Sequence, residues 1–267
     1  MHVHFVVHEL FEAPGAYEAW ARSRGHSVSY SRVYLGDPLP NSAKGIDVLI
    51  VMGGPQSPST TKDECPHFDA KAEIALISRC IAADCAVVGI CLGSQLVGEA
   101  LGARYEHSPE KEIGKFPISL TSDGLANDKF AHFGSVLDVG HWHNDMPGLT
   151  VEAKVIATSE GCPRQIVEYS SLVYGFQCHM EFTLEAIAPT IQLARVSTIL
   201  PMCRPESINR CASAAASSGK VWYTCGLSAP ASSRGQTLAF SACAMAPLNA
   251  TERARNVEPV TVKRLRI

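Results

Sequence analysis

Short apolar runs alternate with amphipathic segments through residues 3–90, and this alternation limits what the chain can fold into. The apolar runs have the length of strands and cover residues 3–10, 26–34, 46–54 and 85–90. Helical segments lie between them at 14–26, which begins with proline, and at 65–84, which has one apolar side. Parallel strands joined by such helices form a sheet that is covered on both faces. The pattern predicts a doubly wound α/β fold with a mainly parallel sheet.

Later apolar runs follow one another too closely for helices to lie between them. They cover residues 116–121, 135–143, 152–159, 164–170 and 172–179. Strands separated by short turns pair in antiparallel fashion. We therefore expect these runs to form a small antiparallel addition to the parallel sheet.

The chain changes in charge and texture near residue 200. Residues 1–200 hold 14 Lys and Arg against 23 Asp and Glu, whereas residues 201–267 hold 9 against 3. The last part shows neither the strand period nor the helix period, and its composition buries too little apolar surface to offset the entropy of ordering. We expect an α/β domain at 1–199 and a basic, Ser/Ala-rich tail at 200–267 that is disordered or loosely packed. An altered reading frame in the source gene would produce the same change in composition and the same lack of periodicity.

Composition also bears on partners and location. The charge excess of the tail is diffuse and is not interleaved with aromatic residues, so we expect a solvated extension and no nucleic-acid partner. No apolar run approaches the roughly 18 residues of a membrane span, and the N-terminus lacks the basic start of a secretory signal. The ten cysteines show no paired spacing. We expect reduced thiols in a cytoplasmic protein without membrane attachment.

The stretch AVVGICLGSQLVGEALG, residues 86–102, places Cys91 where an apolar run passes into a helix expected to begin near Ser94. Gly89 and Gly93 remove side chains that would crowd a sharp strand-to-helix turn, as around the nucleophile in GxSxG sequences. The free N–H groups at the start of a helix favour a thiolate. A cysteine at a tight turn can also be a small buried hydrophobe. The glycine frame favours a nucleophile at Cys91.

A nucleophile needs a base and an orienting group, and LVYGFQCHMEF, residues 172–182, contains both. On a strand with a period of two, His179 and Glu181 lie on the same side at its end, so that the carboxylate can hold the imidazole. The same pattern on its own is also compatible with a surface pair. The donors for an oxyanion are expected at the backbone N–H groups of Gly54, within a Gly-Gly-Pro turn, and of Leu92.

The segments GGPQS, GICLGSQ and QCHMEF, in this order and at these separations, resemble the three signature segments of class I glutamine amidotransferases. The segments EIGKFPISLT and GHWHNDMPGLT resemble more narrowly the stand-alone, GMP synthase-like branch, and the likeness covers roughly residues 45–195. The resemblance implies a flavodoxin-like fold. It implies a hydrolase that cleaves a γ-glutamyl amide bond through a thioester, releasing ammonia from glutamine, with the triad Cys91, His179 and Glu181.

The resemblance also implies residues that contact the substrate. Gln95, one helical turn after the nucleophile, would help to hold its amino-acid end, and His143 and Asp145 lie in HWHND, which matches a family loop near the substrate pocket. His141, His143 and Asp145 could in principle bind a metal, but further ligands are not evident, so we expect no metal and no cofactor. Met180 departs from the family, which usually has proline after the histidine.

An amidotransferase delivers ammonia to a synthetase, and the sequence contains no SGGxDS-type loop of a synthetase. Either a separate polypeptide accepts the ammonia or the domain only hydrolyses the amide bond. Two alternatives remain open: a γ-glutamyl peptidase acting on glutathione-like peptides, and a catalytically silent amidotransferase-like binding subunit. The sequence does not indicate an oligomeric state.

Overall fold

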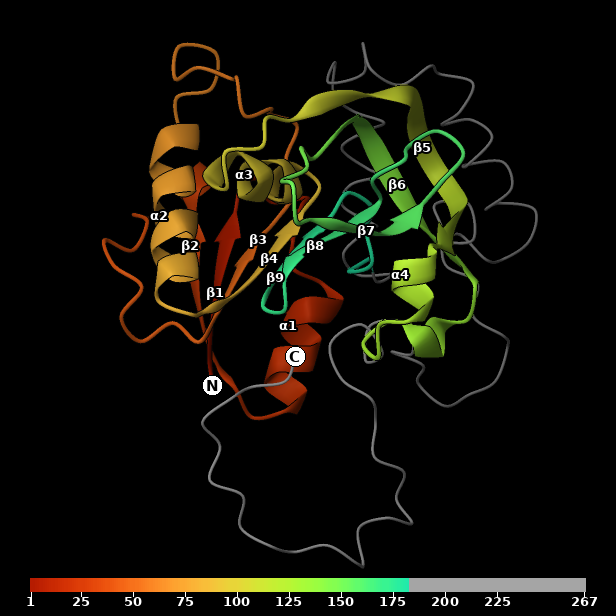
Figure 1. The fold of residues 1–267 in the computed structure, drawn as a ribbon. Coiled ribbons are helices and arrows are strands. Elements are labelled where there is room, and N and C mark those ends of the chain that lie inside the picture. Colours follow the sequence, from red (N-terminus) through yellow and green to blue (C-terminus); the bar gives the residue numbers. More distant parts are fainter. Residues whose placement is uncertain (183–267) are drawn as a thin grey trace, which may run out of the picture.

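Residues 1–182 are described by the structure, a computed structural model, and they contain a nine-stranded sheet (Figure 1). The strands follow the order β2-β1-β3-β4-β9-β8-β7-β5-β6 across the sheet. The predicted boundary after residue 199 and the predicted tail at 200–267 lie outside the described residues.

The strands on one side of the sheet are parallel and form the doubly wound part that the sequence predicts. They are β1 (His2–Val7), β2 (Ser27–Arg32), β3 (Val48–Val51), β4 (Ala86–Ile90) and β9 (Val173–Phe176). The strand order reverses at β1, because β2 lies on one side of it and β3 on the other. Open α/β sheets bind ligands outside the carboxyl ends of the strands at such a point.

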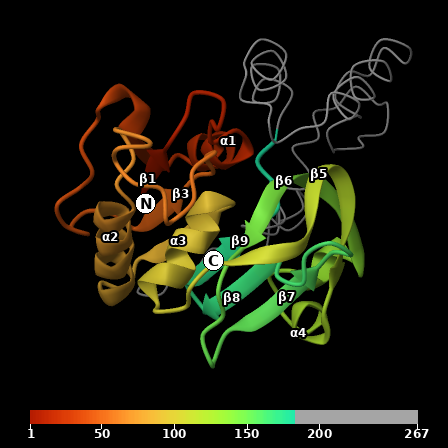
Figure 2. The ribbon, with the colours of Figure 1, turned by 90° about the horizontal axis from the view of Figure 1, so that it is seen from above.

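Helices cover both faces of the parallel strands because apolar side chains point alternately to each face. The helices are α1 (Ala16–Ser23), α2 (Ala70–Ala82), α3 (Leu92–Ala100) and α4 (Ser122–Leu125), with single turns η1 (Val33–Leu35) and η2 (Ala131–Phe133). Helix α1 lies on one face, and α2 and α3 lie on the other (Figures 1 and 2). In β1, Phe5 packs in the same cluster as Trp20 of α1, whereas Val6 packs in the same cluster as Leu76 of α2. Burial on both faces explains why these strands read as continuous apolar runs.

Antiparallel strands extend the sheet beyond β9. They are β5 (Glu106–Leu120), β6 (Val136–Met146), β7 (Lys154–Thr158) and β8 (Ile166–Ser170). The addition is larger than predicted, because β5 begins at Glu106 rather than at residue 116. Its first half is mostly charged and exposed and pairs with β6 at the edge of the sheet, so no apolar run marks it. The last run also differs from the prediction: β9 is antiparallel to β8 but parallel to β4.

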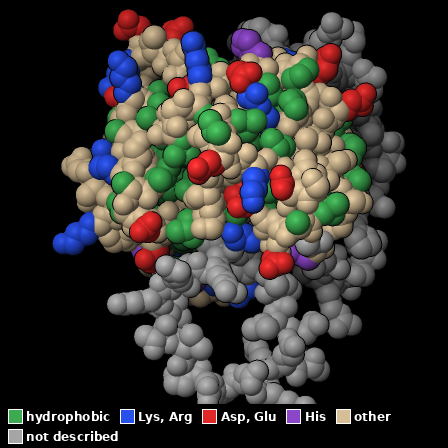
Figure 3. Space-filling view, viewed as in Figure 1, with side chains coloured by type: hydrophobic (Ala, Val, Ile, Leu, Met, Phe, Trp, Pro, Cys, Tyr) green, Lys and Arg blue, Asp and Glu red, His purple; other side chains and the backbone are tan. Residues whose placement is uncertain are grey.

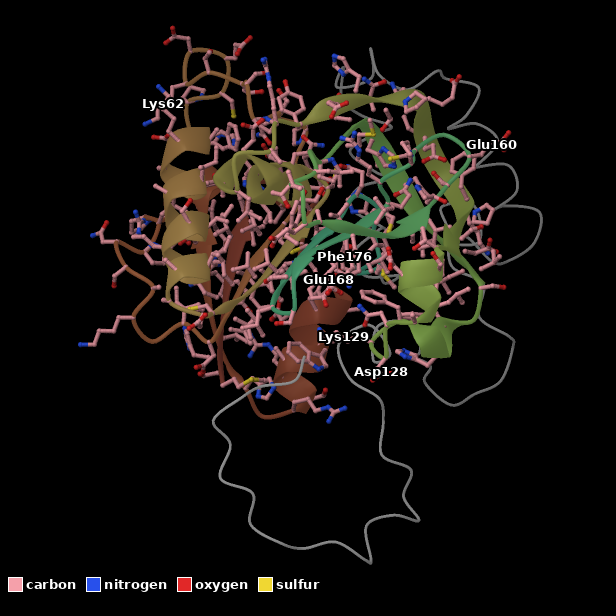
Figure 4. All side chains as sticks on the ribbon, viewed as in Figure 1. Lys62, Asp128, Lys129, Glu160, Glu168 and Phe176 are labelled. Carbon is pink, nitrogen blue, oxygen red and sulfur yellow. The ribbon has the colours of Figure 1, made fainter. Side chains whose placement is uncertain are left out.

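An aromatic cluster ties the segment after α4 to the β8–β9 hairpin. Phe130 is 1% exposed, and its ring centroid lies 5.8 Å from that of Tyr174 and 6.2 Å from that of Phe176. The Lys129 ammonium donates to the Tyr174 hydroxyl at 2.7 Å, and this hydroxyl donates to Glu168 Oε2 at 2.8 Å. Figure 4 shows Lys129 close to these strands. The contacts hold β9, the strand that leads into QCHMEF.

The surface seen in Figure 3 carries acidic and basic side chains that are interspersed, without a broad field of one sign. A basic face of the kind that binds nucleic acid is therefore not visible in this view. Within residues 1–182, none of the helices is long and apolar enough to cross a membrane.

Candidate active site

The carboxyl ends of β1, β3, β4 and β9 meet at one edge of the sheet, and the predicted residues Gly54, Cys91 and His179 follow the last three of these strands. His8 comes directly after β1, Gly53 follows β3, and Cys91 comes directly after β4. His179 lies just beyond the end of β9 at Phe176. Because β4 lies between β3 and β9, Cys91 sits between the other two segments. The fold thus gathers the three signature segments at the edge where α/β proteins bind ligands.

Cys91 occupies the sharp turn between β4 and α3 that the sequence predicts. Its φ of 50° and ψ of −107° lie in a region that few non-glycine residues adopt, and such residues concentrate at functional sites. A Cβ atom on Gly89 would collide with the carbonyl group of Gly93, and one on Gly93 would collide with the carbonyl group of Val51. Both glycines are therefore needed for the turn to pack against β3.

Helix α3 begins at Leu92, earlier than the predicted start near Ser94, so Cys91 is itself the N-cap residue. The backbone N–H and the hydroxyl of Ser94 both donate to the Cys91 carbonyl oxygen, at 3.0 and 2.7 Å. Early closure of the first turn places Cys91 at the positive end of the helix dipole.

Gln177 contacts Cys91, the predicted nucleophile, and no sequence motif indicated it. Its Nε2 donates to Cys91 Sγ at 3.4 Å, and its Oε1 accepts from Ser94 Oγ and Gln95 Nε2, each at 3.2 Å. Gln177 is fully buried. A donor held in this way favours negative charge on the sulfur. The sequence feature that could have indicated Gln177 is its position two residues before His179, which places both side chains on the same side of an extended segment.

The imidazole of His179 and the carboxylate of Glu181 form the predicted pair. Nδ1 of His179 lies 2.6 Å from Glu181 Oε1, and both side chains are buried. Strand β9 ends before His179, contrary to the predicted strand over 172–179. The residue instead forms an antiparallel bridge with Gly140 of β6, in which the His179 N–H donates to the Gly140 carbonyl at 2.8 Å. The Phe182 ring stacks on the imidazole at 4.5 Å between centroids.

The electrostatic setting of His179 suits proton transfer. Burial alone would lower the pKa of His179, but the Glu181 carboxylate and the Cys91 thiol together raise it well above the usual value for histidine. Nε2 of His179, the nitrogen not used by Glu181, makes no hydrogen bond of ordinary geometry within residues 1–182. It is therefore free to exchange a proton with a sulfur or with a substrate.

Gly54 and Leu92, the predicted oxyanion donors, lie together. A Cβ atom on Gly54 would be 3.1 Å from Leu92 Cδ2. The peptide before Gly54 is held by His8, whose Nδ1 donates to the Gly53 carbonyl at 2.9 Å while its Nε2 pairs with Glu73 Oε2 at 2.8 Å. Burial alone would lower the pKa of His8, but the Glu73 carboxylate and the Gly53 carbonyl, which each face one ring nitrogen, raise it. In a trans peptide the N–H points opposite to the C=O, so the Gly54 N–H points away from His8.

Glu12, in the loop after β1, is a second residue at this edge that no motif indicated. A Cβ atom on Gly53 would lie 2.6 Å from Glu12 Oε2 and 3.3 Å from His179 Cε1, so the carboxyl group borders the predicted triad. Its Oε2 is buried and makes no hydrogen bond within the described residues. Burial raises the pKa of Glu12 to about 7, with the charge of His179 acting against the shift and that of Glu181 adding to it.

The three predicted substrate contacts lie in different surroundings. Gln95 is 3% exposed; its backbone N–H donates to the Cys91 carbonyl at 3.3 Å, and its side chain reaches the Cys91 sulfur through Gln177. His143 is buried, with Nε2 at 3.4 Å from a carboxylate oxygen of Glu112. Asp145, nearer the surface, forms an ion pair with an exposed histidine of β5. Their roles toward a substrate stay predictions.

An open α/β sheet with a cysteine on a strand-to-helix turn beside a buried His–Glu pair has the arrangement of α/β domains that carry a nucleophile at such a turn. The family model for class-I glutamine amidotransferases matches residues 19–192, and the chain belongs to this family.

Relatives of this chain are named as a glutamine amidotransferase-like protein and as GMP synthases. The glutamine amidotransferase-like protein YfeJ of Salmonella typhimurium is 63% identical over 192 residues, which are 72% of this chain and 80% of that protein. The GMP synthase of Edwardsiella ictaluri is 30% identical over 143 residues, which are 51% of this chain but 25% of the synthase. The chain thus matches about a quarter of the length of such synthases.

Solved structures agree with the fold. The protein SMU.1228c is 47% identical and superposes with a TM-score of 0.70, covering 79% of this chain and 95% of that one. A glutamine amidotransferase from Thermotoga maritima is 25% identical with a TM-score of 0.68, covering 82% of this chain and 93% of that one. The predicted α/β fold of the amidotransferase type is confirmed.

Proposed function

We propose that the protein cleaves the γ-glutamyl amide bond of glutamine, with Cys91 as nucleophile, His179 as acid and base, and Glu181 as the group that orients His179. One observation carries the proposal: a cysteine with positive φ at the start of α3 lies near a buried imidazole, whose Nδ1 is 2.6 Å from a buried carboxylate. Nucleophile, base and orienting group in this relation serve enzymes that act through acyl intermediates.

In the first step the thiol proton of Cys91 passes to His179 Nε2. The sulfur then forms a bond with the γ-carbonyl carbon, while the electron pair of the C=O bond moves to the oxygen. The backbone N–H groups of Gly54 and Leu92 would donate to this oxyanion. The contact from His8 to the Gly53 carbonyl supports this role, because it keeps the Gly54 N–H turned away from His8. A single donor of this kind contributes roughly 10²- to 10³-fold to kcat.

The second step breaks the C–N bond. His179 Nε2 donates its proton to the departing nitrogen, ammonia leaves, and a thioester on Cys91 remains. His179 then takes a proton from water, the resulting hydroxide attacks the thioester carbon, and glutamate leaves as the thiolate returns. The raised pKa of His179 supports this sequence, since it favours the imidazolium that gives its proton to the departing nitrogen.

The fate of the ammonia belongs to the same proposal. The chain matches a quarter of the length of the GMP synthase relatives. We propose that a separate polypeptide accepts the ammonia, as a synthetase would. A γ-glutamyl peptidase would use the same triad with a peptide amine as leaving group, and a binding subunit would not use it. Labelling of Cys91 and measurement of the released products distinguish the peptidase and the binding subunit from the proposed amidotransferase.

The test is covalent labelling of the full chain with a chloroketone analogue of glutamine, followed by peptide mass mapping. We expect one modified residue, Cys91, with labelling slowed by free glutamine and abolished in Cys91→Ser. Cys65→Ser is the matched control, because Cys65 is a partly exposed thiol next to His67 and should not matter for labelling. Labelling at Cys65, or no labelling of folded protein, would contradict the proposal.

The preferred substrate is then determined by measuring which product is released faster. Ammonia from glutamine and amines from γ-glutamyl peptides are measured side by side with the same enzyme preparation. Faster release from glutamine supports the amidotransferase reaction, and faster release from peptides replaces it with the peptidase. Labelling without turnover of either substrate would indicate a domain that requires its partner for activity.

A further inference from the structure

Next to the candidate catalytic residues, a second group of buried polar side chains converges on one point. Glu112 comes from β5, His141 and His143 come from β6, and Gln165 directly precedes β8. They are 5%, 1%, 6% and 0% exposed. The sequence showed only the HxH pattern here, because the other two residues lie on different strands.

The spacing of three donor atoms in this cluster is informative. His141 Nδ1 lies 3.3 Å from His143 Nε2, and each of these nitrogens lies 3.4 Å from Glu112 Oε2. Charge-assisted N–H···O bonds are shorter, about 2.7–2.9 Å. A triangle with edges of this length is one face of a tetrahedron whose centre lies about 2.1 Å from each corner, and this is the length of Zn–N and Zn–O bonds. The atoms are therefore spaced as ligands of a common ion.

The orientation of two of the side chains is fixed from outside the cluster. His141 Nε2 donates to the Phe116 carbonyl at 3.2 Å, which leaves the lone pair of Nδ1 facing the cluster. Metal-bound histidines commonly use the second nitrogen in this way. The Glu112 carboxylate accepts from the Gly161 N–H at 3.2 Å and from Ser159 Oγ at 2.8 Å. Both ligands are held before any ion arrives.

Gln165 completes the group. Its Nε2 lies 2.6 Å from Glu112 Oε2, 2.9 Å from Ser159 Oγ and 3.1 Å from a nitrogen of each histidine, although an amide has two hydrogens for these four acceptors. Its Oε1 is buried and makes no hydrogen bond within the described residues. A half turn of the carboxamide exchanges the two atoms without changing their shape and directs Oε1 at the cluster. The site then has two nitrogen and two oxygen donors.

We propose that Glu112, His141 and His143 bind one Zn²⁺ ion, with the carbonyl oxygen of Gln165 as fourth ligand. This reverses the expectation of no metal that the sequence supported. Imidazole nitrogens suit zinc, whereas Mg²⁺ and Ca²⁺ prefer all-oxygen sites. Four protein ligands and burial describe a closed site, which has a structural role. The proposal does not depend on the proposed function.

The position of the ion explains what it would stabilise. His141 follows Gly140, whose backbone pairs with His179, and the Trp142 carbonyl accepts from Cys91 Sγ at 3.8 Å. Residues 140–143 of β6 therefore border both halves of the predicted triad. An ion that links this segment to β5 and to the loop before β8 would hold it in place.

The test measures metal in the full chain, purified reduced and without a histidine tag. Mass spectrometry of the metal content, or equilibrium dialysis against zinc after chelation, should give one zinc ion per folded chain. Glu112→Gln and His141→Asn should lower this to background and reduce the Tm. His132→Ala, at an exposed histidine, is the control and should bind zinc like the wild type.

Cobalt substitution of the wild type covers the case in which both variants fail to fold. A four-coordinate site with nitrogen and oxygen ligands gives intense visible ligand-field bands without a thiolate charge-transfer band in the near ultraviolet. Folded wild type that takes up no zinc, zinc retained in both folded variants, or a thiolate band that points to the cysteines would each overturn the proposal.

Discussion

At Cys91 the backbone conformation and the proposed chemistry are linked. A non-glycine residue with φ of 50° costs on the order of 1–3 kcal/mol, and the surrounding structure must offset this strain. Gly89 and Gly93 do so by allowing β4, α3 and β3 to approach one another closely. The turn holds the buried sulfur at the start of a helix. The strained backbone lowers the stability of the folded state but fixes the position of the sulfur.

Replacement of Glu181 tests the proposed pair directly. Because the Glu181 carboxylate raises the pKa of His179, Glu181→Gln should lower that pKa. The alkaline limb of kcat/KM, where the imidazolium loses its proton, should then move to lower pH. We expect kcat to fall roughly 10⁴-fold, as for other triads that lose the orienting carboxylate. The check is a pH–rate profile of both proteins, and an unmoved alkaline limb would argue against the pairing.

Glu12 offers a test at the level of stability. Its pKa is raised to about 7 in the folded protein, so between its unfolded value near 4.5 and pH 7 the folded state keeps a proton that the unfolded state has lost. Stability therefore falls as the pH rises through this range. Glu12→Gln removes the penalty and should stabilise the protein above pH 7 by up to about 3 kcal/mol, with little effect below pH 4.5.

Chemical denaturation at pH 4.5 and pH 8 measures this difference. Glu152→Gln, at an exposed carboxylate, is the control and should show no such pH-dependent gain. If Glu12→Gln destabilises the protein at pH 8, the carboxyl group is held by favourable contacts instead.

At the scale of elements, the loops after β1 and β3 act together. The buried His8–Glu73 pair joins the end of β1 to α2, and the second nitrogen of His8 holds the Gly53 carbonyl after β3. The ends of three elements are thus fixed relative to the peptide that carries the Gly54 N–H. This connection makes the proposed oxyanion donor part of the rigid framework.

Replacement of Glu73 should affect both stability and rate. Breaking a buried charged pair costs about 3–5 kcal/mol. Because the pKa of His8 is raised, the contribution of the pair is complete below pH 6.5 and is lost as the pH rises through the raised pKa, so the Tm difference between wild type and Glu73→Gln should shrink at alkaline pH. The rate effect should appear in kcat more than in KM, because the oxyanion exists only in the transition state and intermediate.

Thermal unfolding at pH 6 and pH 9 together with steady-state kinetics provides the measurement. Glu18→Gln is the control, since Glu18 forms an exposed pair with Arg22 on α1 and exposed pairs contribute little to stability. A Tm difference that grows with pH would contradict the assignment of charge to His8.

At the scale of the whole molecule, the sheet order decides which segments can react together. β4 lies between β3 and β9, so the turns after these three strands are neighbours although they are far apart in sequence. The antiparallel strands also border the candidate site, because Gly140 of β6 pairs with His179. The site therefore depends on both halves of the sheet.

The predicted domain boundary can be tested on the whole chain. The family match ends at residue 192, and the change in charge lies near residue 200. A chain that ends after Ile199 should keep the Tm of the full chain within a few degrees and should label at Cys91 at the same rate. The comparison uses differential scanning calorimetry and the labelling assay. A large loss of Tm would place residues 200–267 within the cooperative unit.

The sequence indicated the parallel strands, the strand-to-helix turn at Cys91 and the pairing of His179 with Glu181, because each depends on local signals: apolar runs, glycines and a two-residue spacing. It did not indicate the first half of β5, whose charged side chains hide its pairing. It also missed Gln177, Glu12 and Glu112. These polar residues gain their surroundings only from strands that are distant in sequence.

The sequence by itself determined the α/β pattern and the chemistry available at the ends of its strands, since periodicity and glycine placement act over a few residues. Only the tertiary structure decided which polar groups share a buried space. It placed Glu12 beside His179 and gathered Glu112 and Gln165 around the two histidines of β6. The physical reason is that burial and charge proximity, which set pKa values and ligand geometry, arise from strand order rather than from local spacing.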